Sequence, residues 1–129
     1  EFIQEARRAR KVVGGGMRQA GIIAAAGIVA LEQMVARLAE DHANARRLAA
    51  GIASLPGIEL DLTRVQTDIV IFSLHRPGMT PEQLVATMRQ RGVLFFPIGG
   101  NRLRLVTHYG VEEDDVDYAI TQFHEVLAA

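Results

Sequence analysis

The chain has 129 residues, 49% of them hydrophobic, which is enough for one globular unit with its own core. Fourteen basic and fifteen acidic side chains leave a formal net charge of -1, so the overall charge gives no attraction to nucleic acid or to an anionic membrane. The sequence contains no cysteine, which excludes disulfides, thiolate nucleophiles and cysteine-ligated zinc and makes the cytoplasm the expected compartment.

The sequence gives no sign of a membrane anchor or a leader. Its most apolar run, residues 20–31, is shorter than the roughly 20 residues that a spanning helix needs, so we expect a buried helix there. No charged leader with an apolar stretch and a small-residue cleavage site opens the chain. It begins without methionine, which indicates a fragment.

The N-terminal part is predicted to be helical. Residues 2–12 are strong helix formers, and three glycines at 14–16 end the pattern. Residues 17–50, rich in alanine and leucine, predict one long helix or two abutting helices, with small residues between Gly21 and Ala30 for close packing, including packing between subunits. The apolar positions at near-helical spacing are Ile23, Leu31, Met34, Val35, Leu38 and Leu48.

The remaining residues predict short strands and two helices. Gly51 and the Pro56-Gly57 pair are expected to break the long helix, and Thr80 is expected to cap a helix that has Pro81 at its first position. A tight turn containing Gly99 and Gly100 should join the last two strands. The predicted strands are 58–62, 68–74, 93–97 and 102–106, and the predicted helices are 81–91 and 111–127.

This order of elements predicts an α/β protein of the α+β type. Long N-terminal helices precede a small, mostly antiparallel sheet that has helices packed on one face. We expect residues 1–50 to form a helical linking segment that contains the Gly14–Gly16 loop, and residues 51–129 to form a small C-terminal domain.

Two basic regions are candidates for anion binding. The glycine loop, with Met17 and Arg18 after it, predicts either backbone N–H groups and a guanidinium around an anion or a flexible hinge, and the hinge is the commoner structure. Lys11 is the only lysine, but it ends a basic run that is typical of a solvated helix face, which favours a surface or anion-contact role over a nucleophile.

Arg102 and Arg104 alternate along a predicted strand and therefore share one face, where either guanidinium could bind a carboxylate through two donors. An exposed strand face with arginines paired to carboxylates is the plainer alternative. His108 follows as a loop residue or a site lining. The histidines show no metal-ligand spacing and no hydrolase motif is present, so we expect no metal site.

Several ordered motifs resemble the low-specificity L-threonine aldolases, members of the β-eliminating lyase group with the type I pyridoxal-phosphate fold. The resemblance begins at Arg10-Lys11-Val12-Val13-Gly14-Gly15-Gly16-Met17-Arg18-Gln19, continues through Leu38-Ala39-Glu40-Asp41-His42, and returns at Arg104-Leu105-Val106-Thr107-His108. It implies that the chain is the C-terminal portion of such an enzyme, including its small domain.

The resemblance also implies roles for individual residues. The lysine that forms the aldimine with pyridoxal phosphate lies upstream in the family, so no catalytic residue is expected in this chain. Arg104 corresponds to the arginine that binds the substrate α-carboxylate, and Lys11 and Arg18 lie near the cofactor. Arg102 falls outside the motif.

The resemblance implies an enzyme that cleaves L-threonine or L-allo-threonine to glycine and acetaldehyde. Its partners are the large domain of the same polypeptide and further copies in a dimer or tetramer, and the isolated chain should be inactive. The alternative is a non-catalytic module that binds a small anion or dimerises. Nucleic-acid binding through the run at residues 7–11 is disfavoured because that run has no interleaved aromatic residues.

Overall fold

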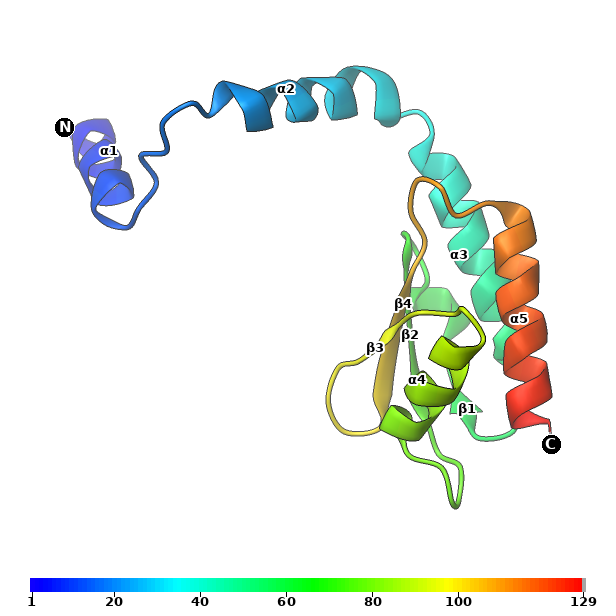
Figure 1. Cartoon of the computed structure of the whole chain (residues 1–129). Helices are drawn as coiled ribbons and strands as arrows, with labels where there is room; N and C mark the ends of the chain where they lie inside the picture. The colour runs from blue at the N-terminus through cyan, green and yellow to red at the C-terminus, as the bar shows by residue number, and fades with distance from the viewer. Residues whose placement is uncertain (129) are drawn as a thin grey trace. The chain divides into compact units, whose positions relative to one another are not determined.

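A computed structural model describes residues 1–128, which divide into two units, residues 1–36 and residues from Arg37 onward. In the first unit, α1 spans Phe2–Val12 as predicted, and a loop separates it from α2, Gly21–Val29 (Figure 1). One turn of π-helix, η1, Ala30–Met34, continues α2. The predicted helix start at Met17 is wrong because residues 18–20 form a turn in which Gln19 has a positive φ of 52°.

The first unit has no buried residue. Ile22 on α2 is 80% exposed and Leu31 on η1 is 75% exposed, so the apolar side chains of this helical stretch have no cover within residues 1–36. The prediction that the apolar positions of residues 17–50 face a core is therefore mostly wrong, because Ile23, Val35 and Leu38 are also exposed. Only Leu48, in the second unit, is buried.

The second unit begins with α3, Leu38–Ile52, after turn residues 35–37, which makes two helices out of the predicted run. Gly51 does not break α3. A Cβ at Gly51 would lie 2.5 Å from Cδ1 of Ile120, so this glycine serves the close approach of another helix. We expected the chain to divide at residue 50, but the structure divides it after Ala36 because α3 contributes to the core of the second unit.

Four antiparallel strands form the sheet, in the order β1-β2-β4-β3. The central pair is β2, Ile69–Leu74, and β4, Arg102–Val106. β1, Ile58–Glu59, is shorter than predicted because the side chain of Asp61 accepts a hydrogen bond from the Thr63 N–H and starts a 3₁₀ turn, η2, Leu62–Arg64. β3, Phe96–Pro97, is also shorter than predicted.

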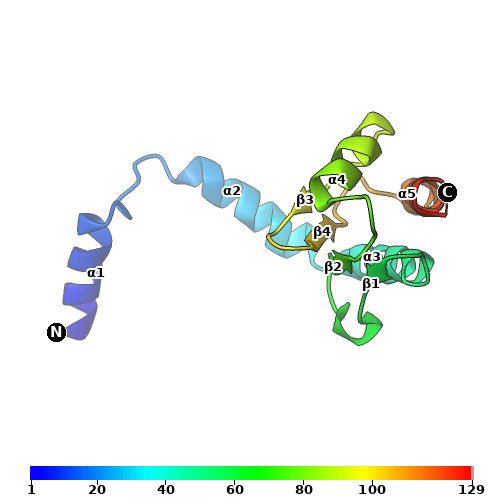
Figure 2. The same ribbon diagram turned by 90° about the horizontal axis from the view of Figure 1, so that it is seen from below.

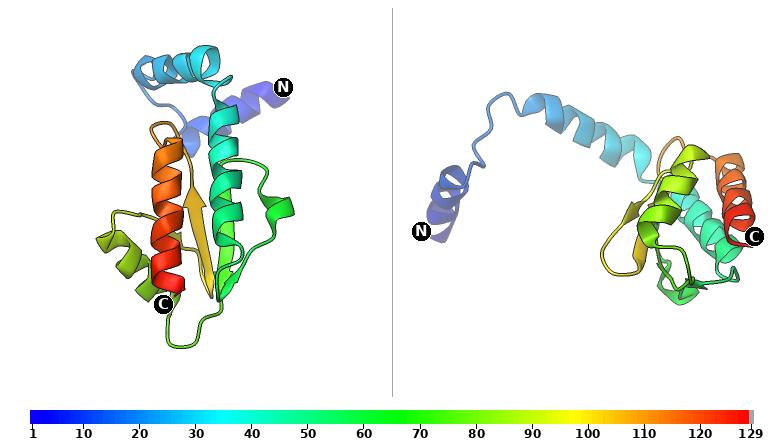
Figure 3. Two further views of the ribbon diagram at one scale, coloured as in Figure 1. Left: turned by 90° about the vertical axis from the view of Figure 1, so that its right-hand side faces the viewer. Right: turned by 60° about the horizontal axis from the view of Figure 1, so that its bottom comes forward.

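The core lies between the sheet and its helices. α3 and α5, Glu113–Leu127, lie side by side over one face of the sheet (Figure 3, left), and α4, Pro81–Gln90, lies beside β3 (Figure 2). The rings of Phe72, Phe95 and Phe123 meet in this core at centroid distances of 5.5–6.3 Å. The predicted fold class, a small antiparallel sheet covered on one face, is confirmed.

The predicted turn and cap chemistry is also confirmed. Thr80 and Gln83 form a reciprocal capping box at the start of α4, and Gly99 and Gly100 both have positive φ in the β3–β4 turn. α5 begins two residues later than predicted because Glu112, not an earlier residue, is its N-cap. Within residues 1–128 no single helix is long and apolar enough to cross a membrane; only the broken pair Gly21–Met34 and Leu38–Ile52 together reach that length and composition.

Candidate functional site

Arg104 lies in the middle of β4, on the face of the sheet that the helices leave open. Leu103 and Leu105, which alternate with it, are buried on the opposite face. Its cross-strand neighbours are Ile71 on β2 and Phe96 on β3. None of the ion pairs within residues 1–128 involves Arg104. Arg104 is therefore an exposed cation on a strand, between two apolar side chains.

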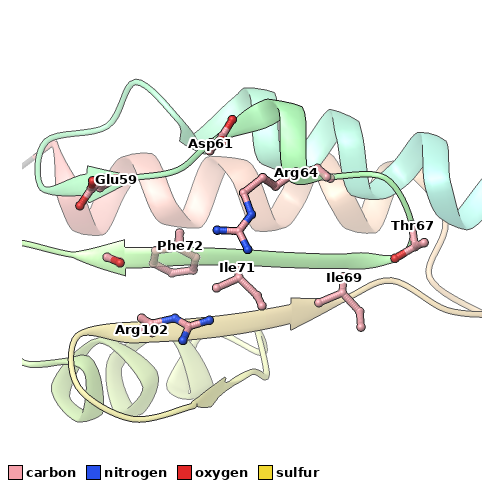
Figure 4. Close-up of a pocket in the computed structure, with 10 residues that line it drawn as sticks. Glu59, Asp61, Arg64, Thr67, Ile69, Ile71, Phe72 and Arg102 are labelled. Carbon is pink, nitrogen blue, oxygen red and sulfur yellow. The ribbon is translucent and has the colours of Figure 1, made fainter.

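Arg102 shares this face, as predicted from the alternation, but it borders a different feature. It lines an open hollow of about 460 Å³ together with Ile71 and Arg64, and Arg104 does not line this hollow. Figure 4 shows the Arg64 side chain reaching from the η2 turn over β2, with Arg102 on the neighbouring strand. Sequence reasoning missed Arg64, because nothing in its neighbourhood marks a turn that folds back over the sheet.

The hollow is lined by both positive and negative side chains, which makes it a poor binding site for an anion. Glu59 and Asp61 line it beside the two arginines. Hydrogen bonds from the hydroxyl and the N–H of Thr63 hold the pKa of Asp61 below its usual value, so this carboxylate stays charged at neutral pH. The arrangement is typical of a solvated surface in which arginines and carboxylates neutralise one another.

Lys11 lies in the last turn of α1, and its stem runs along the glycine loop. A Cβ at Gly16 would lie 3.4 Å from Cδ of Lys11. The loop folds back on the helix, since the N–H of Gly15 donates to the carbonyl of Arg10 at 2.7 Å. A Cβ at Gly15 would lie 2.5 Å from Cγ of Arg10. The glycines therefore allow a close backbone approach around the end of α1.

Lys11 and Arg18 lie in the first unit and Arg104 lies in the second. Both Lys11 and Arg18 are exposed, as is Arg104. None of the ion pairs within residues 1–128 involves Lys11, Arg18 or Arg104. The roles of the three residues stay predictions that depend on the rest of the polypeptide.

A buried polar cluster lies just beyond β4, and sequence reasoning missed it. Asp41 is 4% exposed and Thr107 2% exposed. Arg37 donates to both carboxylate oxygens of Asp41, at 2.7 and 2.9 Å, and these bonds raise the pKa of the Arg37 guanidinium. The Thr107 hydroxyl donates to the main-chain carbonyl of Asp41 at 2.7 Å.

His108 follows this cluster and is exposed. Its Nδ1 lies 2.8 Å from the main-chain oxygen of Tyr109. Because a carbonyl oxygen can only accept, Nδ1 is the donor in this contact. The choice between a loop residue and a site lining stays open. Within residues 1–128 no three histidine or acidic side chains lie close enough to hold a metal ion.

The folded part of the chain resembles known structures. One match, "The structure of MppP soaked with the product 2-ketoarginine", has a TM-score of 0.61 and 12% identity and covers 78% of this chain and 30% of that one. The fold is that of a C-terminal segment of fold type I pyridoxal-phosphate enzymes.

Sequence comparison assigns the chain to one family within this class of enzymes. The Beta-eliminating lyase family profile matches residues 1–75, and the chain belongs to that family. It is 37% identical to the low specificity L-threonine aldolase of Escherichia coli strain K12 over 99% of its length, and 32% identical to low-specificity L-threonine aldolase 1 of Arabidopsis thaliana over 98%. In both cases it spans 36% of the relative's length.

Pyridoxal phosphate is the cofactor of the intact enzyme in this family. Residues 1–128 do not by themselves form its pocket. The single lysine is exposed. Every buried side-chain nitrogen or oxygen in this part of the chain already has a hydrogen-bond partner, so none is left for a cofactor to satisfy. Lys11 and Arg18 carry the positive charge that would suit the cofactor's anionic phosphate, whereas the N–H groups of Gly14 and Gly15 already donate to carbonyls of α1.

Proposed function

We propose that the full-length protein cleaves β-hydroxy amino acids such as L-threonine or L-allo-threonine to glycine and an aldehyde, and that Arg104 binds the substrate α-carboxylate. The observation that carries the second point is the position of Arg104: it is exposed on β4, has no ion-pair partner within residues 1–128, and opens the Arg-Leu-Val-Thr-His motif. A planar guanidinium can bind both oxygens of a carboxylate.

The neighbours of Arg104 support this role. Ile71 and Phe96 flank it across the strands and exclude water from its sides once a ligand covers the face. A lower local dielectric strengthens the attraction between the guanidinium and a carboxylate. A carboxylate held at two points also fixes the orientation of the substrate backbone, which favours cleavage of the Cα–Cβ bond by the cofactor.

The test compares Arg104→Lys and Arg104→Ala with Arg102→Ala in the full-length enzyme. Arg104→Ala should lower kcat/KM on L-threonine by roughly a hundredfold, the effect of losing a charge-assisted bidentate pair, and Arg104→Lys should recover only part of it. Arg102→Ala is the matched control, since it removes the same charge from the same strand face. Equal kinetics for Arg104→Ala and the wild-type enzyme would refute the role of Arg104.

The isolated 129-residue chain is proposed to be inactive. Its one lysine is exposed at the end of α1 beside three arginines. Incubation with pyridoxal phosphate and borohydride should therefore leave no stoichiometric label on Lys11. Specific labelling accompanied by aldolase activity of the isolated chain would overturn this proposal.

A dimerisation role for this chain is supported by the first unit. Ile22, Ile28 and Leu31 are exposed around and just after α2, and a helix surface that is apolar on all sides needs a partner to be stable. The partner is the large domain of the same polypeptide or another subunit of a dimer or tetramer. Sedimentation of the full-length Ile22→Glu variant, compared with Glu5→Gln on α1, tests whether the face lies between subunits.

A further inference from the structure

The N-terminal half of α3 continues the inward face of that helix with polar side chains. Further along, Ala45, Leu48 and Ile52 are buried on this face and pack into the core. Asp41 and, just before the helix, Arg37 precede Ala45 at intervals of four residues, which keeps them on the same side. The inward side of α3 is therefore apolar over most of its length and is hydrogen-bonded near its N-terminal end.

The start of α3 is hydrogen-bonded to the segment 107–111, which follows β4 and has no regular secondary structure. At one end, the Thr107 hydroxyl donates to the main-chain carbonyl of Asp41 at 2.7 Å. At the other end, Nδ2 of Asn44 donates to the carbonyl of Val111 at 2.9 Å. Two hydrogen bonds from opposite ends therefore fix this segment against α3.

A third contact lies between these two. The guanidinium of Arg37 is 5.0 Å from the centroid of the Tyr109 ring, within the range of a cation–π interaction. The Asp41 carboxylate holds Arg37 there through two hydrogen bonds, and the Asp41 main-chain carbonyl accepts the bond from Thr107, so this one residue takes part in two of the three contacts. The name "α3 clamp" is used below for Arg37, Asp41 and Thr107.

The chemistry of the α3 clamp is better suited to fixing geometry than to adding stability. Burying a carboxylate has a desolvation cost that its ion pair roughly cancels, whereas an apolar residue at this position would continue the packed face. Bidentate hydrogen bonds and a buried hydroxyl instead fix direction and distance. A polar cluster in this place requires a reason other than the folding of the core.

The place of the α3 clamp in the chain gives that reason. Thr107 directly follows β4, three residues after Arg104, and Arg37 is the first residue of the second unit. The clamp is therefore a non-covalent link between the point where the chain leaves the first unit and the strand that carries Arg104. We propose that Arg37, Asp41 and Thr107 are positioning residues that fix Arg104 for carboxylate binding, an inference that rests on the proposed function.

The experiment uses Thr107→Val and Asp41→Asn in the full-length enzyme, with Thr107→Ser as the conservative variant. Both disruptive variants should raise KM for L-threonine by roughly 3- to 30-fold, the range of couplings between neighbouring positions, with a smaller change in kcat. Thr107→Ser retains the hydroxyl and should keep KM within about twofold of the wild-type value. Amide hydrogen exchange at Tyr109 and Val111 should become faster in Thr107→Val and Asp41→Asn only.

Asp117→Asn is the matched control, because Asp117 forms a similar bidentate pair with Arg47 of α3 but joins α5 rather than β4. It should leave KM and exchange in the segment 107–111 unchanged. If Thr107→Val and Asp41→Asn match Asp117→Asn in KM while Arg104→Ala still impairs binding, the positioning role is wrong and the proposed function stands. If Arg104→Ala has no effect, the proposed function fails first.

Tyr109→Leu is a further variant that tests the same proposal if Asp41→Asn does not fold. The Tyr109 ring is 71% exposed, so its replacement removes the stacking partner of Arg37 without opening the core. We expect an increase in KM in the same direction as for Thr107→Val, and smaller in size. An unchanged KM for both Tyr109→Leu and Thr107→Val would overturn the positioning role.

Discussion

Arg47 on α3 and Asp117 on α5 form a two-point ion pair, with N–O distances of 2.6 and 2.7 Å across the interface of the two helices. The same guanidinium also lies 2.7 Å from an oxygen of Glu113. The Arg47 hydrogen bonds lower the pKa of Asp117, and the pKa of Arg47 is raised in turn. The pair is solvent-exposed, so its effect on stability is small and depends on salt.

This pair predicts a pH dependence with a definite sign. Because the pKa of Asp117 is lower in the folded chain than in the unfolded chain, its stabilisation is complete above the unfolded value of about 3.9 and is lost as pH falls through the folded value. The difference in unfolding free energy between wild type and Asp117→Asn should be constant from pH 5 to 8 and shrink below about pH 4. Urea denaturation at several pH values measures it. A difference that grows on acidification would contradict the assignment.

Gly51→Ala should destabilise the second unit although alanine is the better helix former. The new Cβ would lie 2.5 to 3.0 Å from three carbons of Ile120, a branched side chain with little freedom to move. Overpacking of this kind costs about 1–3 kcal/mol, against about 1 kcal/mol gained in helix propensity. Thermal and urea denaturation of the chain measure the balance.

Gly27→Ala is the control for Gly51→Ala, because Gly27 lies in α2 with open space around its Cα. It adds the same methyl group without a clash, so only the gain in helix propensity remains. An equal or greater stability for Gly51→Ala than for wild type would show that α5 moves aside at no cost.

Gly15→Ala should weaken cofactor binding in the full-length enzyme, if Lys11 and Arg18 lie near the cofactor as proposed. A Cβ at Gly15 would lie 2.9 Å from the carbonyl oxygen of Arg10, which is backbone and cannot turn away. The loop must therefore move together with the Lys11 stem that runs along it. Losing one hydrogen bond from a charged group costs about 1.5–3 kcal/mol, which corresponds to roughly tenfold to hundredfold weaker binding.

Cofactor titration followed by absorbance measures the effect of Gly15→Ala. Gly21→Ala, at a position with open space, should bind pyridoxal phosphate as the wild-type enzyme does. Unchanged affinity in Gly15→Ala would place the loop away from the cofactor and remove Lys11 and Arg18 from the proposed site.

Sequence reasoning succeeded where local chemistry decides the structure. The cap at Thr80 and the glycine turn at residues 99–100 were predictable because the side chain or the backbone freedom that forms them lies within a few residues. The alternation along residues 102–106 likewise predicted that Arg102 and Arg104 share one face of the strand. The class of fold followed from the order of the elements.

Sequence reasoning failed where the local structure or burial of a residue depends on contacts with residues that are distant in the sequence. Gly51 was taken for a helix breaker because its partner, Ile120, is far along the chain. Asp41 carries no local sign of burial, since its burial depends on Thr107, 66 residues away. The apolar run at residues 20–31 predicts a buried helix, but its composition does not tell whether the residues that cover it lie in the same unit.

The absence of buried residues in the first unit has a consequence for how this protein is handled after synthesis. Ordering its backbone costs about 1–2 kcal/mol per residue, and no interior within residues 1–36 offsets that cost. A copy without a docking partner therefore exposes a long, cleavable segment that ends at the well-packed α3. Proteases would cut such copies within residues 1–36, so release of the second unit would report that a molecule lacks its docking partner.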